Sequence, residues 1–64
     1  MRKKKFTRGN PILSVSYAVE LIVSGNYVFF REKPMHPGWM AGMPLRTIMN
    51  LVQRGLIYQA LRNE

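Results

Sequence analysis

The chain has 64 residues, no cysteine and no aspartate, and its ten lysines and arginines outnumber three glutamates to give a net charge of +7. This length allows one domain, and the absence of cysteine excludes disulfides and thiolate metal sites. One histidine, His36, and three glutamates supply neither a nucleophilic triad nor a zinc or calcium cage, and no glycine-rich phosphate loop is present. We therefore predict a single small α+β domain that is not an enzyme and uses no cofactor or metal.

The composition also indicates where the protein works. The lack of cysteine fits a reducing compartment, and no apolar run approaches the roughly 18 residues of a membrane span. An apolar stretch follows the basic start, but Glu20 interrupts it, unlike the core of a signal peptide. We expect a cytoplasmic protein with no membrane partner. Because so small a core supplies only roughly 3–5 kcal/mol, a homo-oligomer is as well supported as a monomer.

Residues 1–9 are expected to form a flexible basic arm. Within residues 1–8 the chain carries cations and no acid, and the cations are Arg2, Lys3, Lys4, Lys5 and Arg8. These charges repel one another, and Met1 and Phe6 are the only apolar residues there that could pack. Arms of this kind contact phosphate groups, although they also serve as solvated tails that keep small proteins in solution.

Residues 10–24 fit two secondary structures. In the helical interpretation, Asn10 caps the helix, Pro11 takes its first position, and Ser24–Gly25 ends it. In the strand interpretation, apolar residues alternate from Leu13 to Val23, and Gly25–Asn26 turns the chain into a hairpin. The capping signals at both ends favour the helix, and the strand remains the alternative.

Residues 27–31 are rich in aromatic and β-branched side chains and predict a strand. Tyr27 and Phe29 would share one face of it, with Val28 and Phe30 on the other. Aromatic side chains on a strand near Arg31 and Lys33 would suit stacking on unpaired bases. The alternative is that one face joins the core and the other packs on a helix or a second subunit.

A proline-rich connector spans residues 33–44. It contains Trp39, Met40 and Met43, and tryptophan and methionine are frequent at protein interfaces. The alternative is that Trp39 and Met40 fold back to cap the core. His36 is expected to be an exposed loop residue.

Beyond the connector, apolar residues at Leu45, Ile48, Met49 and Val52 predict a helix over residues 45–53. Gly55 ends it, and residues 56–61 are predicted to form a strand. Residues 21–27 and 51–57 show the same order of apolar segment, glycine and strand, 30 positions apart. This repeated order predicts a domain over residues 10–64 with two helices and two strands in α-β-α-β order. If the first segment is a strand, the order is β-β-α-β.

Residues 51–58, Leu-Val-Gln-Arg-Gly-Leu-Ile-Tyr, resemble the recognition helix and first wing of winged-helix DNA-binding domains. The resemblance implies contacts from this helix to bases or phosphates. The stretch from Gly25 to Trp39 resembles small basic proteins encoded in the early regions of tailed bacteriophages and prophages. That resemblance implies a partner that is a nucleic acid or a host protein, and it assigns no residue.

These observations favour a non-catalytic binding module for nucleic acid, DNA or RNA, in a regulatory or accessory role. The residues expected to bind it are Arg2, Lys3, Lys4, Lys5, Arg8, Arg31, Lys33, Arg46 and Arg54. The alternative is a modulator or inhibitor of a host protein, with Trp39, Met40 and Met43 as interface anchors and the arm as steering charge.

Overall fold

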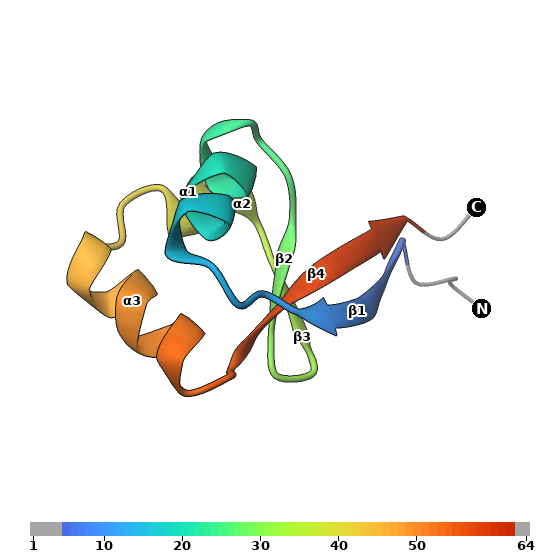
Figure 1. Ribbon diagram of the computed structural model, residues 1–64. Coiled ribbons are helices and arrows are strands. Elements are labelled where there is room, and N and C mark those ends of the chain that lie inside the picture. Colours follow the sequence, from blue (N-terminus) through green and yellow to red (C-terminus); the bar gives the residue numbers. More distant parts are fainter. Residues whose placement is uncertain (1–4, 63–64) are drawn as a thin grey trace.

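The computed structural model describes residues 5–62, in which three helices pack on one face of a four-stranded antiparallel sheet (Figure 1). In chain order the elements are β1 (Phe6–Pro11), α1 (Val15–Val23), β2 (Val28–Phe30), β3 (Lys33–Met35), α2 (Pro37–Met40), α3 (Leu45–Gln53) and β4 (Ile57–Arg62). The strands lie in the order β1-β4-β2-β3, so the last strand is paired with the first and the second. Within the described residues, every helix is too short or too polar to span a bilayer.

The predicted α+β class is confirmed, but the α-β-α-β order with two helices is wrong because β1, β3 and α2 were not expected. The first segment is the helix α1, as favoured, although it begins after Ser14 and not at Pro11. The Ser14 side chain accepts a hydrogen bond from the Tyr17 backbone N–H at 3.3 Å, which caps the first turn. The predicted bounds of α3, residues 45–53, are confirmed.

Two unpredicted elements lie in the proline-rich connector. β3 contains Pro34, which an edge strand tolerates because the missing N–H would point away from the sheet. The short helix α2 begins with Pro37, whose fixed backbone angle suits a first helical turn. His36 is its N-cap residue, and its Nδ1 accepts a hydrogen bond from the Gly38 backbone N–H at 2.9 Å.

The boundary of the expected arm also differs, because residues 6–9 belong to β1. β1 runs antiparallel to β4, with Phe6 opposite Arg62 and Arg8 opposite Ala60. The partner strand lies some fifty residues away in the sequence, and its backbone groups offset the cost of ordering a charged segment. Residues 1–4 of the expected arm lie outside the described residues.

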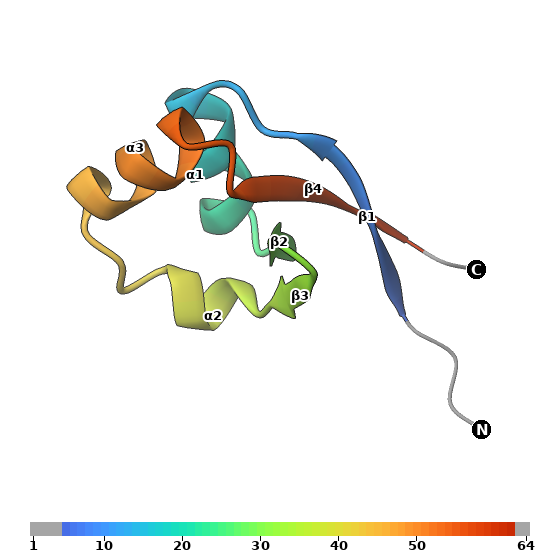
Figure 2. The same cartoon turned by 90° about the horizontal axis from the view of Figure 1, so that it is seen from below.

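β1 bends where its register with β4 shifts. Arg8 faces Ala60 and Pro11 faces Tyr58, so two residues of β1 lie opposite one residue of β4, as in a β-bulge. Gly9 lies at this point, and a Cβ there would come within 2.9 Å of the Leu61 Cγ. The two strands extend together away from the helices and twist strongly around each other (Figure 2).

The sequence pattern that recurs after 30 residues corresponds to a repeated structure. α1 and α3 each have nine residues, and each ends at a glycine with positive φ, 81° at Gly25 and 67° at Gly55. Matching hydrogen bonds close both helices: Asn26 N–H donates to the Leu21 carbonyl and Leu56 N–H to the Leu51 carbonyl, both at 2.9 Å. Each helix then leads into one of the two central strands.

A single core lies between the helices and the sheet. The buried residues face one another from every layer and are Ile12, Ala18, Ile22, Val28, Met40, Ile48, Val52 and Ile57. Of the predicted helical face, Ile48 and Val52 are buried, whereas Leu45 and Met49 at the same spacing are exposed. Fewer residues of α3 therefore face the core than the apolar spacing predicted.

Replacing Ile48 with aspartate should unfold the domain, because it places a charge without a partner in this core. Asn50→Asp adds the same charge to the exposed side of the same helix and should leave the fold intact. Circular dichroism with urea titration measures both. An Ile48→Asp protein as stable as Asn50→Asp would show that the core is placed wrongly.

Candidate functional site

The face of the sheet turned away from the helices, called the open face here, carries four aromatic side chains: Phe6, Tyr27, Phe29 and Tyr58. Phe29 of β2 lies directly opposite Tyr58 of β4, so their side chains share one face. The Phe6 ring stacks on Tyr27, with ring centroids 4.4 Å apart and planes inclined by 27°. β1 and the entry to β2 thus meet across this face through aromatic contact.

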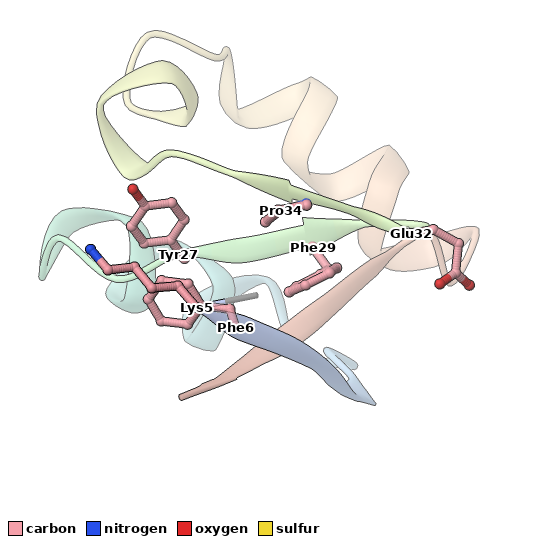
Figure 3. A pocket seen from close by; sticks show the side chains of 6 residues that line it. All are labelled: Lys5, Phe6, Tyr27, Phe29, Glu32 and Pro34. Atoms are coloured by element: carbon pink, nitrogen blue, oxygen red, sulfur yellow. The ribbon is translucent and has the colours of Figure 1, made fainter. Parts of the chain in front are cut away.

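A shallow cavity of about 270 Å³ opens on this face, lined by Lys5, Phe6, Tyr27, Phe29, Glu32 and Pro34 (Figure 3). Phe29 is only 5% exposed although the helices cover the other side of its strand. Phe6 and Pro34 lie on either side of it, from β1 and β3. The walls are therefore mostly aromatic or apolar, with Lys5 and Glu32 as the charged groups near the two ends.

Arg8 lies beside this cavity and is held from two sides. Its guanidinium carbon lies 4.5 Å from the centre of the Tyr58 ring, in cation–π geometry. Its Nη1 donates to the Glu32 Oε2 at 2.6 Å, with the two side chains 39% and 80% exposed. An exposed pair of this kind contributes at most about 1 kcal/mol to stability. Its main effect is to fix the two charged groups relative to the aromatic side chains.

Glu32 reaches this position through a tight turn between β2 and β3. The register pairs Phe30 with Lys33, which leaves Arg31 and Glu32 as a two-residue connection. Arg31 has φ of 60°, which costs a side chain other than glycine roughly 1–2 kcal/mol. The strain is concentrated in the turn that presents Glu32 to Arg8.

A second hollow, of about 320 Å³, is lined by the Phe6–Tyr27 pair and by Ala60 of β4. Lys5 and Arg62 also line it and are its cations. Arg62 lies opposite Phe6 in the β1–β4 register, so it belongs to the same face. The open face therefore combines three cations, Lys5, Arg8 and Arg62, with stacked aromatic rings.

The remaining predicted cations lie elsewhere. Arg31 lies in the β2–β3 turn and Lys33 directly follows it. The Arg31 N–H donates to the Leu56 carbonyl at 2.9 Å, which brings that turn close to the end of α3. Arg54 is the C-cap of α3, and Arg46 lies in its first turn. Arg2, Lys3 and Lys4 lie outside the described residues. Of the predicted set, the structure therefore brings Lys5 and Arg8 together with the aromatic side chains.

The sequence predicted part of this face. Tyr27 and Phe29 lie on the opposite side of β2 from Val28, which is fully buried in the core. The contributions of Phe6, Tyr58 and Arg62 were missed. An alternation of outward residues in the last strand, Tyr58-Ala60-Arg62, was a signal for two of them. Phe6 gave no such signal because its segment was interpreted as an arm.

The predicted interface anchors separate in the structure. Met40 is 1% exposed and fills the core, whereas Trp39 is 71% exposed. Met40 therefore follows the core-capping alternative and Trp39 does not. Met43 is partly buried and lines an apolar groove of about 230 Å³ between α1 and α3, with Val23 and Leu45 among its exposed residues.

Residues 5–62 hold no group of three or more histidine, cysteine, aspartate or glutamate side chains that could bind an ion. His36 is exposed, as predicted, and its ring lies edge-on to Tyr27 with centroids 5.3 Å apart. His36 therefore links the N-terminus of α2 to an aromatic ring of the open face.

No protein family, curated protein or solved structure matches this chain at a significant level. The geometry of the segment that resembles a winged helix differs from a wing: after α3 the chain enters β4, which lies between β1 and β2. In the described residues, α3 therefore leads into a central strand of the sheet.

Trp39→Ala should leave the free energy of unfolding within about 0.5 kcal/mol of the original value, because the indole is mostly exposed. The neighbouring Met40→Ala should lower it by about 2–5 kcal/mol, because it leaves a cavity in the core. Urea unfolding of the two variants makes the comparison. A Trp39→Ala protein as unstable as Met40→Ala would contradict the exposed position of the indole.

Proposed function

We propose that this chain is a non-catalytic nucleic-acid-binding module, in a regulatory or accessory role, and that the open face of the sheet is its interface. The observation that supports this most is the combination of Lys5, Arg8 and Arg62 with aromatic rings on one face. Nucleic acids offer two chemical groups that such a face complements: phosphates, which attract cations, and the flat faces of bases, which stack on aromatic rings.

The distribution of charge supports the same proposal. The described residues carry Lys5, Arg8, Arg31, Lys33, Arg46, Arg54 and Arg62 against Glu20 and Glu32. A positive field of this kind raises the rate of encounter with a polyanion. Arg2, Lys3 and Lys4 directly precede Lys5 in the sequence and would add to the charge available for phosphate contacts.

A second candidate, the binding and modulation of a host protein, is supported by the helical side of the molecule. Trp39, Val23 and Leu45 are large apolar side chains that are more than half exposed. Val23 and Leu45 also border the groove that Met43 lines. Exposed apolar side chains beside a groove are typical of protein interfaces. This candidate uses the opposite side of the sheet, so the two functions can be tested separately.

Replacing Lys5 and Arg62 with glutamine tests the first candidate. If both contact phosphates, affinity for nucleic acid should fall, and the slope of log affinity against log salt should shrink by roughly 0.7–0.9 for each lost contact. A matched pair, Arg46→Gln with Arg54→Gln, removes the same charge from the two ends of α3 and should leave the slope unchanged.

Fluorescence anisotropy over a range of salt concentrations measures both pairs. Equal slopes for the two double variants would show that binding depends on net charge and not on the open face. Loss of slope in the α3 pair alone would transfer the interface to the helical side.

A further inference from the structure

The cavity on the open face has the volume and the lining of a site for a small aromatic group. Its volume of about 270 Å³ is below the roughly 300–1,000 Å³ of pockets for drug-sized ligands. Phe29 and Pro34 lie on its strand side, and Phe6 reaches it from β1 (Figure 3). The stack of Phe6 on Tyr27 fixes the Phe6 ring, so the wall is already in place before any ligand arrives.

Glu32 is the feature of this cavity that a phosphate site does not explain. A carboxylate repels phosphate, and its natural partners on a nucleic acid are the N–H donors of the bases. Arg8 already holds one carboxylate oxygen, Oε2, at 2.6 Å. Because an ionised carboxylate has a second acceptor oxygen, Oε1 can still accept a hydrogen bond from a ligand.

We infer that the cavity holds one unpaired base of a single-stranded nucleic acid, with Glu32 accepting from an amino group on the base edge. This inference rests on the proposed function and makes it more specific. Bases inside a duplex are stacked on their neighbours and cannot enter such a cavity. Cytosine presents an N4 amine, whereas thymine and uracil present an O4 acceptor at the same position, so Glu32 should favour cytosine over both.

Arg8 has a positioning role in this arrangement. It is stacked on Tyr58 and paired with Glu32, so it holds the carboxylate at the end of the cavity. Lys5 lies at the other end, where it can meet the phosphate that follows the bound base. The cavity thus offers an aromatic surface to the base face, an acceptor to the base edge and a cation to the backbone.

The first test compares the affinities of labelled oligo(dC), oligo(dT) and a duplex of equal length, by anisotropy at low salt. The original chain should bind the single strands more tightly than the duplex and prefer oligo(dC) to oligo(dT) by about fivefold. Glu32→Gln should remove that preference, because the amide can donate to O4 as well as accept. Oligo(rC) beside oligo(dC) distinguishes RNA from DNA as the source of the base.

The second test removes the aromatic wall. Phe6→Leu keeps an apolar side chain but loses the ring, and affinity for single strands should fall at least about fivefold, with duplex affinity unchanged. Phe30→Leu is the matched control, because Phe30 lies on the other side of β2 and does not line the cavity. Thermal melting of both variants verifies that they are folded, and Glu32→Gln, at an exposed turn, supplies the test if Phe6→Leu unfolds.

The outcomes separate the two claims. Failure to bind any nucleic acid at low salt would overturn the proposed function together with this inference. Equal affinity for duplex and single strands, or a cytosine preference that survives Glu32→Gln, would overturn the base site alone and leave a phosphate-binding surface.

Discussion

The pairing of β4 with both β1 and β2 is the interaction on which the rest of the structure depends. Side chains alternate across a strand, so β4 sends Ile57 into the core and Tyr58 to the open face. The same hydrogen-bonded ladder holds β1, whose Phe6 lines the cavity on that face and whose Arg8 pairs with Glu32 beside it. The core and the candidate site are therefore two sides of one strand, and neither forms without it.

The packing of the described helices on one side of the sheet explains why the site lies where it does. The three helices of the described chain cover one face of the sheet, and on the other face the side chains of the strands pack only against one another.

The two halves of the described chain, β1-α1-β2 and β3-α2-α3-β4, occupy equivalent places in the sheet. If β1 is exchanged with β3 and β2 with β4, the strand order β1-β4-β2-β3 is recovered when the sheet is read from its other edge. The two halves are not identical, because the outer strand β1 has six residues and the outer strand β3 has three. The longer outer strand reaches past the helices and supplies the aromatic wall.

Local signals predicted the elements whose stabilising groups are close in sequence. The helix over residues 45–53 follows from apolar spacing, and its Gly55 end from the need for positive φ. α2 also had a local signal, a residue that can cap followed by Pro37, which the proline-rich composition obscured. β1 had none, because its partner is β4 at the other end of the sequence. The contribution of Phe6 to the cavity went unpredicted for the same reason. Tyr27 and Phe29 belong to a segment that the sequence predicted as a strand, whereas Phe6 reaches the cavity only through the long-range pairing of β1 with β4.

The most direct test of the account is an amide chemical-shift map of the labelled protein during titration with a cytosine-rich single strand. Binding at the open face should shift the amides of β1, of β4 and of the β2–β3 turn at Arg31–Glu32, because these segments surround the cavity. The amides of α2 and the first turn of α3 should not move. Shifts confined to the helices around Trp39 and Leu45, with β1 and the turn unchanged, would contradict the central claim.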